Sequence, residues 1–289
     1  MYTDDSYIVE EGGVDLHIHT NASDGSFSPE QVMEYAHSVG LEAVGICDHD
    51  TTGGLDAGAR AAAKRGIEFV PGIEFSCPWR GEEHHLLGYY SDAEEPGFAR
   101  ALANCRTERR ARMKATVEAL RALGFEIPQD ILERKGGMID RGDIAWELIN
   151  RGCEKDFATA YPKYFGSDKP GYILPYSVGE AEPLTVRRGI EVIRRAGGVA
   201  VLAHPVGFYV KKMPSEQVRE AVEWGLDGLE VYHPRHTPEQ NRYLLSLVKE
   251  FGLIATGGSD CHGKVKDKPR MGTLRVHRSL LDGLKAARR

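Results

Sequence analysis

Histidine and carboxylate side chains stand where an apolar, strand-like segment of this sequence ends. His17 and His19 close the segment 14–19, and Asp24 follows them on a glycine-containing turn. Because side chains alternate between the two faces of a strand, both imidazoles point the same way. Imidazole nitrogens beside a carboxylate oxygen suit a divalent ion such as zinc, manganese or iron. This segment therefore predicts one part of a metal site.

The same residue types recur where later apolar segments end, except that one histidine begins its segment. These further candidates are His49, Glu74, His85, His204, Asp260 and His262. The full set exceeds the roughly four to six ligands that a single ion takes. It predicts two or three ions that share a bridging carboxylate. Two ions about 4 Å apart can clamp the attacking and leaving oxygens of a displacement at phosphorus.

The segments that carry these donors alternate with predicted helices. Strands are expected at 14–19, 41–50, 67–74, 198–205, 228–233 and 253–262. This alternation is typical of parallel βα units, whose active groups gather at the carboxyl ends of the strands. We therefore expect the donors to meet at one rim. The segment 85–90 begins with its histidine, so we expect it to run against the others as an edge strand or hairpin partner, with His85 at the same rim.

Residues 96–183 interrupt the alternation. A long helix is expected at 98–123, shorter helices near 129–133 and 143–150, and an aromatic loop at 161–172. We expect this insertion to cap the strand ends and to hold the groups that select the substrate.

Charge and cysteine content limit the possible partners and compartments. With 37 basic and 43 acidic residues the net charge is -6, which argues against binding long nucleic acid. The basic run Arg106, Arg109, Arg110, Arg112 and Lys114 is expected to be a solvated helix face, with the alternative that part of it meets a phosphorylated substrate.

Five scattered cysteines without CxxC spacing indicate neither a disulfide framework nor a zinc ribbon. The N-terminal residues 1–5 lack a leader pattern, and no apolar run approaches the roughly 20 residues that span a bilayer. We expect a cytoplasmic protein without a membrane partner. The oligomeric state stays open.

Six ordered segments carry a resemblance to a known family. They are VDLHIHTNASDGSFSP, GICDHDT, VPGIEFS, HHLLGYY, AVLAHP and GGSDCHG. They resemble the motifs of the polymerase and histidinol phosphatase (PHP) family, in particular its stand-alone phosphoesterase branch, from Val14 to His262. The resemblance implies an α/β fold, a distorted (β/α)7 barrel similar to a TIM barrel, with a helical insertion that caps the active site. The barrel would comprise residues 1–95 and 184–289, and the cap residues 96–183.

The resemblance also implies a trinuclear centre of manganese, iron or zinc ions. One ion would be held by His17, His19, Glu74 and Asp260. Glu74 would bridge to a second ion, bound by His85 and His204. The third would be held by Asp24, His49 and His262. Of the neighbours His84 and His85, we prefer His85 because it directly precedes Leu-Leu-Gly-Tyr, as in that branch.

Four residues outside this centre are candidates for contact with the substrate. Arg141 falls where relatives have an Arg-Pro-His that touches a substrate phosphate, but Gly142 and Asp143 replace the last two residues here. This departure favours a non-nucleotide substrate. His236 resembles a family histidine near the scissile phosphate and could act as an acid. His233, three residues earlier, is a further candidate. Lys169 could meet a distal anion. The alternative for each is an ordinary solvated residue.

The sequence thus predicts a metal-dependent phosphoesterase that acts on a small phosphorylated metabolite. A metal-bridging hydroxide would attack phosphorus in a phosphate monoester or in a cyclic phosphodiester of a phosphorylated sugar. The alternatives are a nucleoside 3',5'-bisphosphate phosphatase or a short-oligonucleotide exonuclease. An amidohydrolase-type enzyme would not explain Asp24 and His262, and a non-catalytic PHP module would not explain a complete donor set.

Overall fold

The computed structural model describes residues 7–206, 213–263 and 270–289. The N-terminal residues 1–6, which the predicted barrel includes, lie outside the described residues. Seven strands form one sheet in chain order from β1 to β7. Their bounds are β1 Val14–Ile18, β2 Ala43–Ile46, β3 Glu68–Trp79, β4 Glu82–Tyr89, β5 Val199–Leu202, β6 Gly228–Tyr232 and β7 Ile254–Gly257. The expected α/β class and seven-stranded barrel are confirmed.

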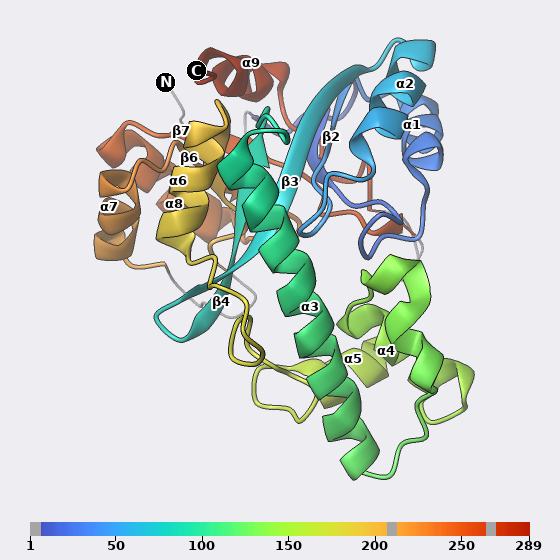
Figure 1. The fold of residues 1–289 in the computed structure, drawn as a ribbon. Coiled ribbons are helices and arrows are strands. Elements are labelled where there is room, and N and C mark those ends of the chain that lie inside the picture. The colour runs from blue at the N-terminus through green and yellow to red at the C-terminus, as the bar shows by residue number, and fades with distance from the viewer. Residues whose placement is uncertain (1–6, 207–212, 264–269) are drawn as a thin grey trace.

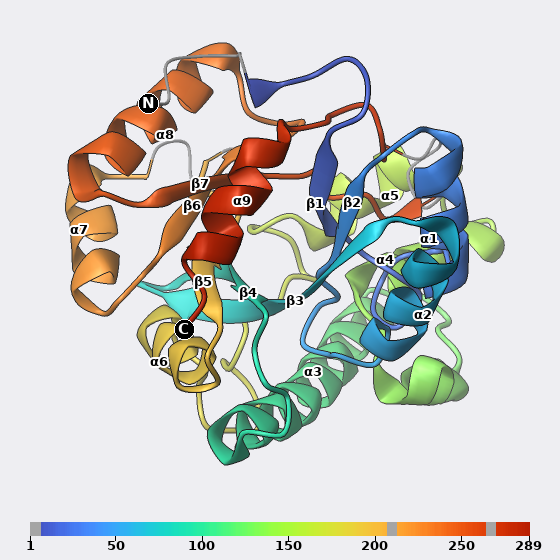
Figure 2. The same cartoon turned by 90° about the horizontal axis from the view of Figure 1, so that it is seen from above.

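The sheet curves until its first and last strands meet. The backbone N–H of His19 donates to the carbonyl of Cys261, and the N–H of Asp260 donates to the carbonyl of His17, at 3.0 and 2.9 Å. Figure 2 shows the strands arranged around a centre, with α9 across the near end and the other helices outside them. The segments that follow β1 and β7 therefore lie side by side although they are far apart in the chain.

Six helices lie around the strands. They are α1 Pro29–Ser38, α2 Leu55–Arg65, α6 Val186–Arg195, α7 Ser215–Glu223, α8 Pro238–Phe251 and α9 Arg278–Ala286. Helix α1 begins at the residues that the sequence favours for a helix start. Ser28 accepts a hydrogen bond from the Gln31 backbone while the Gln31 side chain accepts one from the Ser28 backbone, and Pro29 occupies the first turn. This capping box satisfies backbone donors that would otherwise lack partners.

Strand β4 was expected to run against the others as an edge strand or as a hairpin partner, and of these alternatives the edge position is wrong. It pairs antiparallel with β3 on one side and with β5 on the other. The hairpin prediction is right, because Arg80 and Gly81 reverse the chain with φ angles of 53° and 82°. The second pairing, Leu86–Tyr89 with Val199–Leu202, joins segments more than 100 residues apart. It closes the gap between the two halves of the barrel.

The inserted helices pack around an apolar cluster of their own. They are α3 Pro96–Ala122, the 3₁₀ helix η2 Gln129–Gly137, α4 Arg141–Asn150 and α5 Phe157–Phe165. Met113, Val117 and Leu120 of α3 pack in one cluster with Ile144 and Leu148 of α4. Figure 1 shows α4 and α5 beside the far half of α3, away from the strands. The exact domain boundaries at residues 95 and 184 stay a prediction.

The aromatic segment from Tyr161 to Gly166 was expected to be a loop, but most of it belongs to α5. Asp156 caps this helix by accepting a hydrogen bond from the Thr159 backbone at 2.8 Å. Phe157, Tyr161 and Phe165 stack at four-residue intervals, with ring centroids 5.2 and 5.5 Å apart. Burial of Ala160, Tyr164 and Phe165 in the apolar cluster of the insertion supports this helix although it contains Pro162.

Among the described residues, no helix is both long enough and apolar enough to cross a bilayer.

Candidate metal centre

The nine predicted donors converge at one end of the barrel. They come from strand ends or from loops that leave them, apart from Glu74 and His85, which lie within the paired strands β3 and β4. Three overlapping groups of these side chains have ligand atoms within 4.8 Å of one another. The groups are His17, His19, Glu74 and Asp260; His19, Asp24, His49 and His262; and His49, Glu74 and His85.

The innermost group surrounds one oxygen of Glu74. Its Oε2 lies 3.2 Å from His17 Nε2 and 3.1 Å from His19 Nε2. The two imidazole nitrogens are 3.1 Å apart, and Asp260 Oδ1 lies 3.2 Å from His19 Nε2. Four electron-pair donors that face one another this closely match the surroundings that a divalent cation needs.

The other oxygen of Glu74 faces a different pair of imidazoles. Its Oε1 lies 2.9 Å from His85 Nδ1 and 2.9 Å from His204 Nε2. These two histidines are 3.3 Å apart at the same nitrogens. One carboxylate thus contacts two sets of histidines, which is the arrangement of a bridging ligand.

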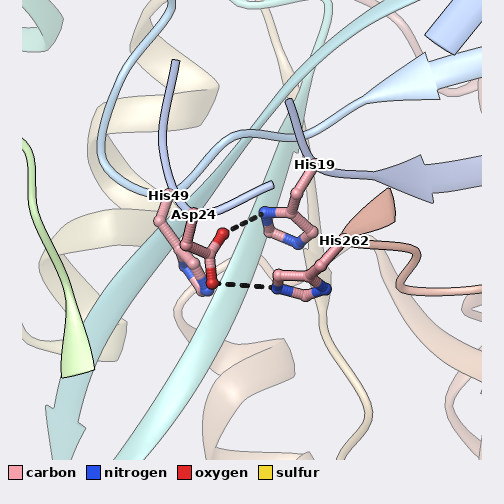
Figure 3. Close-up of side chains that lie close together, drawn as sticks. All are labelled: His19, Asp24, His49 and His262. Atoms are coloured by element: carbon pink, nitrogen blue, oxygen red, sulfur yellow. Dashed lines mark ion pairs between the residues drawn. The ribbon is translucent and has the colours of Figure 1, made fainter. Parts of the chain in front are cut away.

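The third group lies at the solvent side of His19. Asp24 Oδ1 is 3.4 Å from His19 Nδ1, and its Oδ2 is 2.9 Å from His262 Nε2. Figure 3 shows the four side chains of this group turned toward one another. His49 joins this group to Glu74, because His49 Nδ1 lies 3.3 Å from Glu74 Oε2.

The side chains of the donor set leave several of their own ligand atoms without a hydrogen bond, which favours the binding of divalent ions. Four buried atoms, His19 Nδ1, His49 Nδ1, Glu74 Oε2 and His85 Nε2, make no hydrogen bond within the described chain. Leaving buried polar atoms unpaired costs about 1–3 kcal/mol each. Burial lowers the pKa of His49 to about 3, against the opposing carboxylates Glu74 and Asp24, so its imidazole is neutral and able to bind a metal. The cluster is therefore a candidate metal centre.

Adjacent histidines on β4 point to opposite sides. His85 faces Glu74, whereas the ring of His84 lies 5.2 Å from that of Trp79. Burial lowers the pKa of His84 to about 4, with His85 and His204 adding to the effect. The alternation of side chains along a strand explains why only one of the two reaches the centre.

Glu230 on β6 was not predicted from the sequence, yet it contacts two of the donors. It is fully buried. His17 Nδ1–H donates to Glu230 Oε1 at 2.9 Å, and the backbone N–H of His204 donates to Oε2 at 2.8 Å. The first bond leaves the His17 Nε2 lone pair directed at the centre. The one available signal was a carboxylate within the otherwise apolar segment 228–232.

Asp48 orders the loop that carries Asp24. Its Oδ1 accepts hydrogen bonds from the Thr20 backbone at 2.7 Å and from Ser23 Oγ at 2.6 Å, and its Oδ2 accepts one from Thr20 Oγ1 at 2.7 Å. Three hydrogen bonds to one buried carboxylate reduce the freedom of this loop. This contact was not predicted from the sequence.

Three non-glycine residues near the centre have left-handed backbone conformations. The φ angles are 54° for Asp50, 26° for His204 and 49° for Asp260. Such conformations cost about 1–3 kcal/mol each and persist only when surrounding contacts impose them. For His204 one such contact is the hydrogen bond from its backbone to Glu230.

The centre opens into a pocket of about 610 Å³, a volume that includes adjoining solvent. Arg109, Arg112, Arg141, Met113 and Tyr161 line it together with the metal-site donors. The expectation that the arginine run of α3 is wholly solvated is wrong, since Arg109 and Arg112 are 3% and 2% exposed. The side chain of Arg110 between them is 57% exposed. Arg109 and Arg112 are buried because they lie on the face of α3 that turns toward the barrel, whereas Arg110 lies on another face.

The other predicted substrate residues occupy different places. Arg141 lines the pocket. His233 is buried, with Nε2 3.4 Å from Asp260 Oδ2. His236 lies behind His233, at a ring distance of 5.2 Å, and Lys169 pairs with Asp168 at 2.7 Å. Neither His236 nor Lys169 lines the pocket within the described residues. The substrate roles of all four stay predictions.

Comparison with known proteins links this geometry to one family. The family model described as PHP domain matches residues 15–125. The 5'-3' exoribonuclease of Haemophilus influenzae is 31% identical over 253 residues, which cover 86% of this chain and 89% of the relative. The 3',5'-nucleoside bisphosphate phosphatase of Chromobacterium violaceum is 32% identical over 253 residues, 86% of this chain and 87% of its own.

A third relative and a solved structure agree with this result. The phosphoribosyl 1,2-cyclic phosphate 1,2-diphosphodiesterase of Eggerthella lenta is 31% identical over 266 residues, 89% of this chain and 97% of its own. The structure of a Bifidobacterium adolescentis protein described as a metal-dependent phosphoesterase is similar with a TM-score of 0.84 and 29% identity. The similarity covers 96% of this chain and 97% of the Bifidobacterium chain.

Proposed function

Because this chain belongs to the PHP family of metal-dependent phosphoesterases, we propose that it hydrolyses a phosphate ester of a small metabolite at this centre. The observation that carries the proposal is the position of Glu74, whose two oxygens contact different histidines at 2.9 to 3.2 Å. A carboxylate between two imidazole sets favours several ions over one.

The proposed centre holds three divalent ions of manganese, iron or zinc. The first would be bound by His17, His19, Glu74 and Asp260, the second by Glu74, His85 and His204, and the third by Asp24, His49 and His262. Bound ions would lower the pKa of water and stabilise negative charge on the phosphoryl oxygens. The chain supplies the rigid ligand set, and Glu230 and Asp48 orient parts of it.

Two predicted residues lie outside the proposed ligand set, Arg141 at the pocket and His236 behind His233. Arg141 lines the pocket and would bind a phosphate oxygen. His236 Nδ1–H donates to the carbonyl of Val231 at 2.8 Å, and burial lowers its pKa to about 4. The ring is therefore neutral at pH 7, so Nε2 would accept a hydrogen bond. This geometry favours an acceptor over the acid suggested by the sequence.

The names of the relatives support two substrate types. One relative is named for a nucleoside bisphosphate and another for a cyclic phosphate of a phosphoribosyl compound. We favour a monoester or cyclic diester of a phosphorylated sugar, since Gly142 and Asp143 stand where nucleotide-acting relatives have proline and histidine. The second candidate is a nucleoside 3',5'-bisphosphate, or a short oligonucleotide as for the exoribonuclease relative.

Two measurements on the same preparation test the proposal. Elemental analysis of active protein should find about three ions per chain. Phosphate release should then be measured from a sugar monoester, a sugar cyclic phosphodiester and a nucleoside 3',5'-bisphosphate, before and after chelation. Hydrolysis that survives complete removal of metal would contradict the proposal, and one ion per active chain would contradict the three-ion assignment.

A further inference from the structure

A buried carboxylate, Glu83, lies next to the metal-site donor His85. Both side chains belong to β4, and because they are two residues apart they project from the same face of that strand. The side chain of Glu83 is 1% exposed, whereas that of its neighbour Glu82 is 55% exposed. Burial of an ionised carboxylate is costly, so it requires partners that compensate for the lost water.

Two arginines of the insertion provide these partners. Arg112 Nη1 of α3 donates to Glu83 Oε1 at 3.1 Å, and Arg141 Nη1 of α4 lies 3.1 Å from Glu83 Oε2. Arg112 is itself held on another side, because its Nε lies 3.1 Å from Glu108 Oε1. Both oxygens of Glu83 therefore have positions that are set by the inserted helices.

The two ring nitrogens of His85 have different surroundings. Nδ1 faces the centre, at 2.9 Å from Glu74 Oε1 and 3.3 Å from His204 Nε2. Nε2 lies 3.6 Å from Glu83 Oε1, and it is buried with no hydrogen-bond partner among the described residues. A shift of roughly 0.6 Å would shorten this contact to the usual hydrogen-bond length of about 3.0 Å.

Two other histidines of the centre show how such a contact works. His17 Nδ1–H donates to Glu230 Oε1 at 2.9 Å, and His262 Nδ1–H donates to a backbone carbonyl at 2.8 Å. In both rings Nε2 then faces a carboxylate of the donor set. A histidine that binds a metal commonly donates its second N–H in this way, which fixes the tautomer and the ring orientation. For His85 the acceptor in that place is Glu83.

From this arrangement we infer that Glu83 is a positioning residue for the metal centre. It accepts the Nε2–H of His85, so that the lone pair of Nδ1 is directed at the second ion. The inference rests on the proposed function, because it takes His85 as a metal ligand. Arg112 and Arg141 fix the carboxylate that orients this ligand, so the insertion contributes to the metal centre as well as to the pocket.

Attachment of the insertion to the barrel does not explain the place of Glu83. Phe98 and Leu102 of α3 already pack in the apolar cluster of the barrel. Buried ion pairs are often no more stabilising than apolar residues of similar size. The oxygen that accepts from Arg112 is also the one nearest to His85 Nε2, which indicates a function at that ring.

The tautomer of His85 in the wild-type chain tests the inference without any change to Glu83. Full-length protein with ¹⁵N-labelled histidine is loaded with Zn²⁺, which is diamagnetic, and studied by long-range ¹H–¹⁵N correlation spectroscopy. Comparison with H85Q assigns the signals of His85. We expect the proton on Nε2 and the metal on Nδ1. A proton on Nδ1 would overturn the inference, because Glu83 would then face the metal-binding nitrogen.

E83Q removes the charge of the carboxylate and keeps its shape. The affinity for the most weakly bound ion should fall about 10- to 100-fold, as is typical for groups that support a metal ligand. Competition with a chromophoric chelator for Zn²⁺ measures this change. E82Q is the matched control, because it alters an exposed carboxylate one residue earlier on the same strand, and it should bind like the wild type. Unchanged affinity in E83Q would contradict the role of Glu83.

A double-mutant cycle separates positioning of His85 from a general effect of charge or stability. In a chain with H85A, E83Q should cause little further loss of affinity, because the ring that Glu83 orients is absent. An equal loss in both backgrounds would overturn the inference, since the effect would not depend on His85. If E83Q does not fold, the tautomer of the wild-type chain still decides the question.

The same preparations separate this inference from the proposed function. A wild-type chain that binds no metal would contradict the proposed function itself. The other case is a wild-type chain that binds metal and hydrolyses p-nitrophenyl phosphate only when metal is present, while E83Q binds metal as tightly. Then only the role of Glu83 is wrong.

Discussion

Glu74 and His85 show how the position of one side chain decides its chemistry. His84 and His85 are adjacent in sequence, both are histidines and both are largely buried. Only His85 contacts Glu74, because neighbouring residues of a strand point to opposite faces. The pair therefore provides a comparison in which residue type and chain position are nearly constant.

We expect H85A to lose metal and activity, and H84A to keep both. Since His85 is a predicted ligand, its loss should weaken metal binding by more than the ~10- to 100-fold typical of residues that only support a ligand. H84A removes a contact with Trp79 and should lower the unfolding temperature instead. Elemental analysis and calorimetry of both variants measure these effects. Equal metal content in the two would contradict the assignment.

Glu230 is not itself a candidate metal ligand, but it contacts two of the candidate ligands. Its carboxylate holds His17 Nδ1 and the backbone of His204. Burial raises the pKa of Glu230, but the charge and hydrogen bond of His17, together with the nearby His233 and His204, keep that pKa below its ordinary value. An ionised carboxylate at this position fixes the ring orientation and raises the basicity of the imidazole.

E230Q should therefore bind metal about 10- to 100-fold more weakly. Competition with a chromophoric chelator measures this affinity directly. Because glutamine has almost the same shape, the folded structure should survive, and circular dichroism would verify this. E239Q on the exposed start of α8 is the control. Unchanged affinity in E230Q would show that Glu230 does not position His17.

At the scale of elements, the close approach of the end of β7 to β1 positions the inner donors. A Cβ atom built on Gly258 would lie 2.5 Å from the backbone N and the Cβ of His17. No side chain fits there without displacing the strand. A glycine at this point lets Asp260 and His17 reach the same group.

G258A should destabilise the fold and weaken metal binding together. Overpacking of this kind costs about 1–3 kcal/mol, and here the displaced atoms belong to His17 itself. Urea unfolding and metal affinity are the two measurements. G53A is a matched control, since the nearest atom to its added Cβ would be 3.4 Å away. A stable G258A variant with wild-type affinity would mean that the strands tolerate a wider spacing.

At the scale of the whole molecule, the donor cluster links both ends of the described barrel. Ligand atoms from β1, β3, β4 and the segments after β2, β5 and β7 meet there. Any ion that binds them connects distant parts of the chain, so metal binding should stabilise the fold as a whole.

Chelation should therefore lower the unfolding temperature. Metal at about 100 times its dissociation constant contributes ~2.7 kcal/mol, which corresponds to roughly 4–5 °C for a chain of this size. Scanning calorimetry with EDTA, and after replacing it with excess Mn²⁺ or Zn²⁺, measures the shift. A double variant, H17A with D260A, should show no such recovery. An unchanged melting curve after chelation would contradict this structural role of the metal.

Much of the fold and of the donor set could be predicted, because the signals are local. Ser28, Pro29 and Gln31 specify the start of α1 by their own hydrogen bonds. Chemistry-bearing residues at the ends of apolar segments pointed to the candidate metal ligands, and the structure brings these side chains together. The barrel and the family were indicated by the resemblance of the same ordered segments, whereas the order of the strands comes from the structure.

The errors concern contacts between distant segments. Of the two alternatives for β4, the hairpin with β3 was right and the edge position was wrong, because the pairing of β4 with β5 depends on a segment beyond the insertion. Arg112 was assigned to a solvated face because the periodicity of α3 does not reveal which side turns to the barrel. Glu230 was missed because a carboxylate in a strand has no visible partner until His17 lies beside it.

The sequence by itself determined which atoms are available for chemistry, since residue type and local patterning specify the imidazoles, the carboxylates and the strands and helices that present them. Only the tertiary structure decided which of those atoms share a space: that Glu74 lies between two histidine sets and that Arg109 and Arg112 face the pocket. The physical reason is that local propensities act over a few residues, whereas the metal site is assembled by packing between segments that are up to about 240 residues apart, such as His17 and Asp260.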